Sequence, residues 1–308
     1  MPDELQENSP RETRCGFVAL IGAPNVGKST LVNALVGSKV TIVSKKVQTT
    51  RALIRGIVIE DNAQIILVDT PGIFAPKRRL DRAMVSTAWS GAHDADLVCA
   101  LIDARAGIDD EADAILSKLE SVNHPKVLVL NKIDLVPREK LLALAQKANE
   151  RLKFTQTFMV SALSGDGVDD LRRALARDVP PGPFHYPEDQ MSDAPMRHLA
   201  AEITREKIYR HLHQELPYQS TVETDSWQDR KDGSVRIEQT IFVERDSQRK
   251  IVLGKGGATI KAIGADSRKE IAEIVGQPVH LFLFVKVRDG WGDDPERYRE
   301  MGLEFPKE

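Results

Sequence analysis

Residues 15–178 alternate short apolar runs with longer stretches of helical periodicity. Runs of four to six apolar residues read as buried strands, and the stretches between them read as helices. The runs are 17–21, 54–59, 64–68, 97–102, 127–130 and 157–160, and the clearest helical stretches are 30–36, 110–121 and 139–152. This alternation predicts an α/β domain with a mostly parallel sheet and helices on both faces.

The pattern breaks between residues 180 and 196, where five prolines occur. Proline blocks the continuation of both helices and central strands, so this segment predicts a semi-rigid linker. We therefore expect a disordered tail over 1–14, a first domain over 15–179, the linker over 180–196, and a second domain with its tail over 197–308.

The second domain has a different order of elements. Apolar spacing over 199–216 predicts a helix, and alternation over 220–227 and 235–243 predicts two strands joined by a turn at 232–233. Two short helices flank residues 254–257, and 279–287 predicts a last strand. The order α-β-β-α-α-β indicates a small α+β domain.

Composition adds few constraints. The chain has 308 residues, a formal net charge of −3 and two cysteines without metal-ligand spacing. It has no apolar run of about eighteen residues and no signal-peptide core, so we expect a cytoplasmic protein. The net charge does not indicate nucleic-acid binding, but a whole-chain value can hide a basic face on one domain.

A phosphate-binding loop lies between the first strand and the first helix. Its pattern is G-x-x-x-x-G-K-[ST], in which backbone N–H groups and the helix N-terminus surround phosphate oxygens. We expect the lysine to reach the β- and γ-phosphates and the serine to ligate Mg²⁺. The residues are Gly22, Ala23, Pro24, Asn25, Val26, Gly27, Lys28 and Ser29, followed by Thr30.

Two further segments are candidates for the magnesium and γ-phosphate site. A D-x-x-G motif (Asp69, Thr70, Pro71, Gly72) follows the third apolar run. The carboxylate suits an indirect hold on Mg²⁺, and Gly72 offers its N–H to the γ-phosphate. The loop over 45–51 contains a candidate Mg²⁺ ligand, with Thr50 preferred and Thr49 as the alternative, and GTP would order this loop.

An N-K-x-D motif follows the fifth apolar run and predicts the choice of purine. The carboxylate of Asp134 can accept two hydrogen bonds from guanine, whereas adenine would leave it unsatisfied. Lys132 would lie along the base and Asn131 would brace the loop. Ser161 and Ala162, after the sixth run, would present a backbone N–H to guanine O6. These residues predict binding of GTP rather than ATP.

A G-x-x-G motif in the second domain predicts contact with single-stranded RNA. Gly254, Lys255, Gly256 and Gly257 lie between two helices, and residues 245–269 carry seven basic and two acidic side chains. Glycines let a single strand of RNA approach the protein backbone closely, while basic side chains bind the RNA phosphates. The candidate RNA-binding residues also include Lys250, Ile251 and Lys261.

These motifs in this order resemble the Era family of GTPases, and the resemblance covers nearly the whole chain. It implies a KH domain of the prokaryotic type, GTP hydrolysis, and binding of small-subunit ribosomal RNA near its 3′ end during 30S subunit assembly. Ile73 stands where related GTPases carry a catalytic glutamine, so we expect slow hydrolysis, with Lys28, Asn25, Thr50 and Gly72 as the catalytic candidates. Asn25 matches an asparagine that holds K⁺ in some relatives.

Other interpretations stay open. The alternative is a peripheral membrane or cell-cycle signalling GTPase whose KH-like domain contacts protein. The resemblance allows peripheral association with the inner membrane under either interpretation, and we expect a monomer. A third interpretation is an RNA-binding module in which GTP is only structural. RNA co-purification and steady-state phosphate release discriminate among the three.

Overall fold

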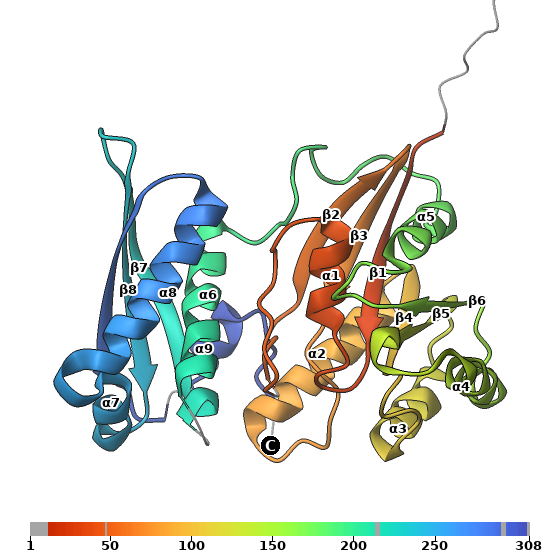
Figure 1. The fold of residues 1–308 in the computed structure, drawn as a ribbon, viewed down its shortest axis with the longest axis horizontal. Helices are drawn as coiled ribbons and strands as arrows, with labels where there is room; N and C mark the ends of the chain where they lie inside the picture. Colours follow the sequence, from red (N-terminus) through yellow and green to blue (C-terminus); the bar gives the residue numbers. More distant parts are fainter. Residues whose placement is uncertain (1–11, 47, 213–215, 291–293, 307–308) are drawn as a thin grey trace, which may run out of the picture.

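The computed structural model describes residues 12–46, 48–212, 216–290 and 294–306. Two domains lie side by side, and the first contains a six-stranded sheet (Figure 1). Its order is β2-β3-β1-β4-β5-β6, and only β2 runs antiparallel to its neighbour, β3. The strands are β1 (Arg14–Ile21), β2 (Ile54–Glu60), β3 (Ala63–Asp69), β4 (Leu97–Asp103), β5 (Lys126–Asn131) and β6 (Gln156–Val160).

Helices cover both faces of this sheet, as the sequence predicts. Every residue of β3 and of β4 is buried, which requires packing on both sides. Helices α1 and α5 pack together over β2 and β3, whereas α2 packs on β1. The helices are α1 (Lys28–Val36), α2 (Arg79–Asp94), α3 (Asp110–Leu119), α4 (Arg138–Arg151) and α5 (Val168–Asp178).

The candidate motifs gather at one edge of the sheet. Strands β1, β3, β5 and β6 run parallel or are linked through parallel neighbours, so their carboxyl ends share that edge. The phosphate loop follows β1, Asp69 ends β3, Asn131 ends β5, and Ser161 follows β6. Ligands of open α/β sheets bind outside the carboxyl ends of the strands.

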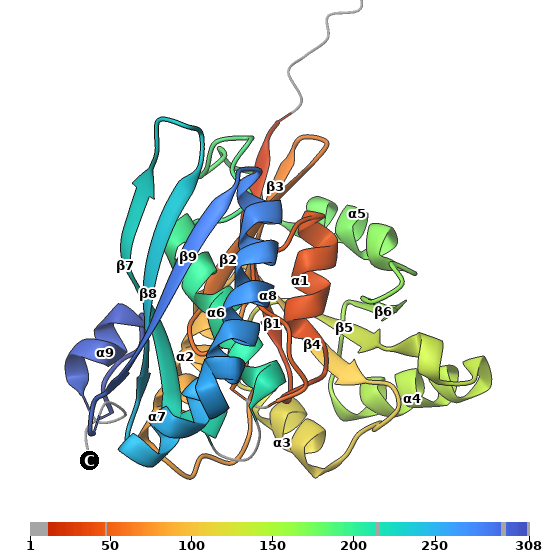
Figure 2. The ribbon, with the colours of Figure 1, turned by 60° about the vertical axis from the view of Figure 1, so that its left-hand side comes forward.

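The second domain confirms the predicted order α-β-β-α-α-β. Its sheet has the order β7-β8-β9, with β8 and β9 parallel and β7 antiparallel to β8. Helices α6 and α8 lie on the side of this sheet that faces the first domain (Figures 1 and 2). The elements are α6 (Met196–His211), β7 (Ser220–Asp229), β8 (Val235–Val243), α7 (Asp246–Leu253), α8 (Ala258–Val275) and β9 (Val279–Val287), followed by α9 (Pro295–Glu300).

The proline-rich connection lies along the first domain. Pro181 forms an isolated β-bridge with Arg14, and Ser192 forms one with Gly56. The buried side chain of Gln64 accepts hydrogen bonds from the backbone of His185 and Tyr186. The connection is therefore a packed segment, which limits the orientations open to the second domain. Residues 1–11 of the expected N-terminal tail lie outside the described residues.

The loop after α1 enters the space between the domains. Ile42 is buried within a core cluster formed otherwise by the second domain, including Leu199 and Ile203. Lys39 donates to Glu206 of α6 at 2.7 Å and is also paired with Glu270 of α8. This first-domain loop is thus packed into the second domain by both apolar and charged contacts.

None of the helices in the described residues is long and apolar enough to cross a membrane.

Candidate nucleotide site and RNA clamp

The phosphate loop is closed by its own lysine. Lys28 opens α1, and its ammonium donates to the carbonyls of Gly22 and Ala23 at 3.0 Å each. Burial lowers the pKa of Lys28 to about 8, against the opposing effect of the Asp69 carboxylate. The loop thus places a buried cation and the N-terminus of α1 on the same concave backbone, which is an arrangement that binds phosphate.

Gly27 is required by the packing of this loop. Its φ is 100°, and a Cβ atom there would lie 2.3 Å from Nδ2 of Asn131. That nitrogen donates to the Val26 carbonyl at 2.8 Å, so the N-K-x-D motif braces the phosphate loop directly. The sequence predicts that Asn131 braces a loop, and the structure identifies which one.

Three oxygen side chains meet at the predicted magnesium site. The Ser29 hydroxyl donates to Asp69 Oδ2 at 2.7 Å, and Thr50 Oγ1 lies 3.2 Å from the same oxygen and 3.0 Å from Ser29 Oγ. Asp69 is fully buried, which raises its pKa although these hydroxyls lower it. Its second oxygen, Oδ1, has no hydrogen-bond partner among the described residues. A buried carboxylate beside two hydroxyls fits a hard cation such as Mg²⁺.

Thr50 rather than Thr49 faces this site. The hydroxyl of Thr49 donates to the Lys46 carbonyl at 2.6 Å and lies 3.1 Å from the Ser44 hydroxyl, so it turns back into its own loop. Thr41, which no sequence motif indicates, donates to Asp69 Oδ2 at 2.9 Å. The loop over 45–51, which GTP is predicted to order, is called the switch loop below. Its Val47 lies outside the described residues.

The D-x-x-G segment lies directly on the phosphate loop. A Cβ on Gly72 would come within 2.9 Å of the Pro24 Cα, so this approach requires glycine. The backbone N–H of Ile73 donates to the Gly22 carbonyl at 3.1 Å. Within the motif, the Thr70 hydroxyl donates to the Leu20 carbonyl at 2.6 Å, while Pro71 is buried. Gly72 is therefore placed beside the loop that would hold the phosphates.

The base-recognition residues are arranged around the same loop. Lys132 has a positive φ of 66°, and its ammonium donates to Asp103 Oδ2 at 2.7 Å and to the Asn25 carbonyl. Asp134 lies in a short 3₁₀ turn, Ile133–Leu135, and is exposed, as a residue that binds an incoming base must be. Asn25 is exposed at the tip of the phosphate loop, with a φ of 63°.

The Ser161–Ala162 segment contacts the N-K-x-D motif and its own loop. The N–H of Ala162 donates to Asn131 Oδ1 at 3.0 Å, and the N–H of Ser161 donates to the Asp166 carbonyl at 2.9 Å. Both amides are engaged within the protein, so the predicted contact with guanine O6 requires a shared hydrogen bond or a rearranged loop. In this structure the segment braces Asn131, because a buried amide oxygen needs a donor.

Asp103 is a site residue that no sequence motif indicates. Burial favours its neutral form, but hydrogen bonds from Arg105 and Lys132 outweigh burial and lower its pKa to about 2. It therefore holds Lys132 in place as a carboxylate at all ordinary pH values. Its position in the sequence could have identified it as a candidate site residue. Like Asp69 and Asn131, Asp103 is a polar residue that ends a buried strand.

The G-x-x-G motif forms a turn between α7 and α8. All three glycines have positive φ, and a Cβ on Gly254 would lie 2.2 Å from the Thr259 hydroxyl, whereas one on Gly256 would meet no described atom within 4 Å. Gly257 caps the N-terminus of α8. Lys250, Lys255 and Lys261 are exposed around this turn, and Ile251 is 56% exposed. The turn thus offers open backbone, cations and an apolar surface at one end of the domain.

The second domain is hydrogen-bonded to the predicted switch loop of the first domain. The guanidinium of Arg205, on α6, donates to the carbonyls of Gln48, at 3.3 Å, and of Thr49, while the Tyr209 hydroxyl donates to Gln48 at 3.1 Å. In the other direction, Arg51 donates to the Ser220 carbonyl at 2.9 Å. Thr50 lies between these contacts. No sequence pattern predicts them, because a basic and an aromatic residue one turn apart occur on many helices.

Comparison with known proteins agrees with this geometry. Residues 17–132 match the family described as 50S ribosome-binding GTPase, and residues 215–292 match the KH domain family. The chain is 84% identical to the GTPase Era of Afipia carboxidovorans and 83% identical to that of Bradyrhizobium diazoefficiens, each over 308 residues and 100% of both chains.

Two solved structures are similar over almost the whole chain. A crystal structure of Era in complex with MgGDPNP and nucleotides 1506–1542 of 16S ribosomal RNA superposes with a TM-score of 0.89 at 37% identity, covering 94% of this chain and 99% of that one. A variant of Aquifex aeolicus Era bound to GDP.AlF4⁻ gives a TM-score of 0.88 at 36% identity, with the same coverage.

Proposed function

Because this chain belongs to the Era family of GTPases, we propose that it is a GTP-driven switch that binds small-subunit ribosomal RNA near its 3′ end and acts in 30S subunit assembly. One observation supports the proposal that GTP acts on the RNA-binding domain. Thr50 contacts the predicted magnesium site, while its neighbours Thr49 and Arg51 contact the KH domain. A change at the nucleotide therefore has a direct route to the RNA-binding domain.

The residues of the nucleotide site have separate tasks in this proposal. Lys28 and the N-terminus of α1 bind the phosphates, and Gly72 directs its N–H at the γ-phosphate. Ser29, Thr50 and, indirectly, Asp69 would hold Mg²⁺, which when bound neutralises charge on the β- and γ-phosphates. Asp134 reads guanine. Calorimetry should show GTP and GDP binding in strong preference to ATP, and equal affinities would overturn the assignment.

Hydrolysis lacks an evident general base among the described residues of this site. Ile73, the residue after D-x-x-G, is apolar and buried, so it cannot orient a water molecule. We propose that the exposed Asn25 helps to hold a K⁺ ion, which when bound would supply positive charge beside the phosphates. Phosphate release should be faster in KCl than in NaCl at matched ionic strength. Equal rates would remove K⁺ from the mechanism without affecting the GTP-binding proposal.

The G-x-x-G turn of residues 254–257, which we call the KH clamp, can be tested as an RNA-binding site with a matched control variant. Gly256→Asp places a negative charge at the turn, where RNA phosphates would pass, and should weaken binding of a 16S 3′-end oligonucleotide. Gly276→Asp is the control: Gly276 also has a positive φ, and a Cβ added there would meet no described atom within 4 Å, but it caps the far end of α8. Equal affinity of both variants would refute the clamp. Binding should also fall with salt, with a log–log slope of about −0.7 per phosphate neutralised.

Coupling between the two sites follows from their shared loop. If GTP changes the arrangement of residues 48–51, it changes how the KH domain is held and hence its affinity for RNA. Linkage then requires RNA to favour the same nucleotide state by the same factor. RNA affinities measured with GDP and with a non-hydrolysable GTP analogue test this directly, and identical values would contradict the coupling.

We further propose that the protein acts as a monomer in the cytoplasm, with peripheral inner-membrane association as an additional property. Light scattering tests the first point. Vesicle sedimentation with anionic and neutral lipids tests the second, and membrane binding that competes with RNA would favour the signalling alternative over ribosome assembly.

A further inference from the structure

The C-terminal tail, described over residues 294–306, packs on the first domain. Tyr298 and Leu303 are buried, at 0% and 3% exposure, in an apolar cluster with Leu80, Ala83 and Met84 of α2. The tail lies beyond residue 292, where the KH family match ends. The tail side of this contact therefore lies outside both family matches, whereas the α2 side lies within the GTPase match.

Aromatic contacts fix the tail on α2. The rings of Tyr298 and Phe305 pack edge to face with centroids 4.9 Å apart, and the Arg79 guanidinium lies 4.9 Å from the centroid of Phe305. The Leu303 N–H donates to the Tyr298 carbonyl at 2.7 Å, which closes the turn after α9. Tyr298 and Leu303 are thus presented together to one face of α2.

The same cluster reaches the segment that follows D-x-x-G. Phe74 packs against it, two residues after Gly72. Ile73, between them, is hydrogen-bonded to the phosphate loop. The position of α2 and Phe74 therefore constrains where the Gly72 N–H points.

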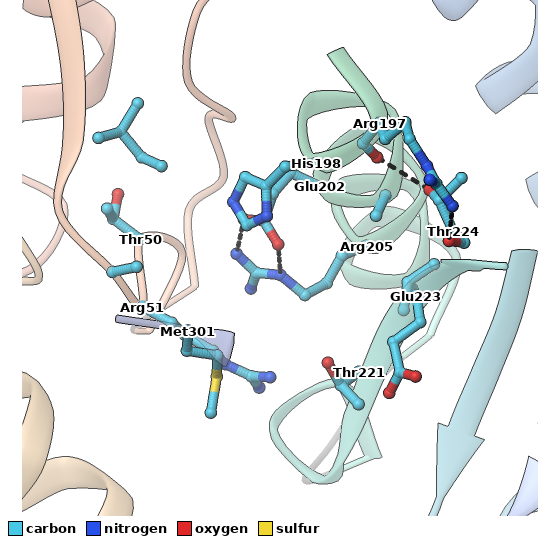
Figure 3. A pocket seen from close by; sticks show the side chains of 14 residues that line it. Thr50, Arg51, Arg197, His198, Glu202, Arg205, Thr221, Glu223, Thr224 and Met301 are labelled. Atoms are coloured by element: carbon cyan, nitrogen blue, oxygen red, sulfur yellow. Dashed lines mark hydrogen bonds and ion pairs between the residues drawn. The ribbon is translucent and has the colours of Figure 1, made fainter. Parts of the chain in front are cut away.

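Helix α2 also joins this segment to the switch loop. Asp81, buried on α2, accepts from the Gln48 amide at 2.6 Å and from the backbone N–H of Arg78 at 2.9 Å. On the other side, Met301 of the tail and Thr50 and Arg51 of the switch loop line a cavity of about 310 Å³ between the domains (Figure 3). The tail therefore packs on α2 and Phe74, and its Met301 lines the same cavity as Thr50 and Arg51.

We propose that Tyr298 and Leu303 are positioning residues for GTP hydrolysis. They hold α2 and Phe74 so that the Gly72 N–H meets the γ-phosphate, and they act through these residues without touching the nucleotide. The inference rests on the proposed GTPase function. It predicts a specific pattern: GDP binding, which uses the phosphate loop and the guanine site, is independent of the tail, whereas recognition of the γ-phosphate depends on it.

The test uses the full-length protein with Tyr298→Ala and, separately, Leu303→Ala. We expect kcat to fall about tenfold, since small displacements of positioning groups cost this much or more. The ratio of GTP to GDP affinity should also fall about tenfold, roughly the effect of one charge-assisted hydrogen bond. Tyr298→Phe and Leu303→Met preserve the packing and should restore both values. Arg299→Ala, at an exposed position on the same helix, is the matched control.

Each outcome decides the proposal. Parallel losses of GTP and GDP affinity would mean that the tail only stabilises the fold, and unchanged kcat and affinity ratio would mean that it does not act on the site; either result overturns the inference. Failure of the proposed function is distinguishable, because it appears in the unmodified protein as a lack of guanine preference or of phosphate release.

Discussion

The contact of Arg205 with the switch loop provides the sharpest test of domain coupling. The perturbation is Arg205→Met combined with Glu202→Gln. The double change is needed because Arg205 is paired with Glu202, and its removal alone would leave a largely buried carboxylate without its cation, at a cost of up to about 3–5 kcal/mol. Methionine retains most of the apolar stem, so the helix keeps its packing.

The expected magnitude follows from the two contacts with residues 48 and 49 that are lost. Arg205 donates to the carbonyls of Gln48 and Thr49, and hydrogen bonds from a charged group contribute about 1.5–3 kcal/mol each when buried. If half of that energy differs between the nucleotide states, the coupling falls by about 1.5–3 kcal/mol, within the range of known allosteric couplings. The ratio of RNA affinities with GTP analogue and GDP should thus shrink at least about tenfold.

The assay is fluorescence anisotropy of a labelled 16S 3′-end oligonucleotide with each nucleotide saturating. Arg197→Met is the matched control: it lies on the same helix, and its guanidinium donates to the carbonyls of Thr224 and Asp225 within the KH domain. The control should retain the ratio. If the double variant also retains it while the unmodified protein shows coupling, the grip of α6 on the switch loop is not the route.

Three other predictions concern the nucleotide site. Burial lowers the pKa of Lys28 to about 8, whereas bound phosphate favours its charged form. Nucleotide binding should therefore take up a proton near this pH, and the affinity should fall above pH 8 by up to about tenfold per pH unit. Calorimetry in buffers of different ionisation enthalpy measures the proton uptake, and an affinity that does not change with pH would contradict the prediction. Asp134→Asn should reduce GTP affinity at least about hundredfold and favour xanthosine triphosphate, which competition binding can detect. Gly27→Ala should abolish binding of both GTP and GDP, since its Cβ would lie 2.3 Å from Asn131 Nδ2; retained GDP affinity would show that the loop adapts.

Local sequence determined the elements and the chemistry of the motifs. Apolar runs predicted each strand of both sheets to within a few residues, because buried strands and amphipathic helices leave periodic patterns. Asp69 and Asn131 directly follow apolar runs, and Lys28 and Gly72 lie a few residues beyond such runs. A parallel sheet brings its carboxyl ends together, so chain order and strand direction were sufficient for this part of the site.

Only the tertiary structure decided how the parts act on one another. Thr50 and Thr49 are adjacent and chemically alike, and only their contacts show which hydroxyl faces Asp69: Thr49 turns to Ser44 and Lys46, whereas Thr50 lies beside Ser29 and Asp69. Arg205 contacts the switch loop, and Tyr298 contacts α2, across more than 150 positions of the sequence. The groups contacted are backbone carbonyls and apolar side chains, which occur throughout the chain and so do not mark a particular partner. A backbone carbonyl carries no side-chain identity, so the residue that binds it is set by the way the two domains pack.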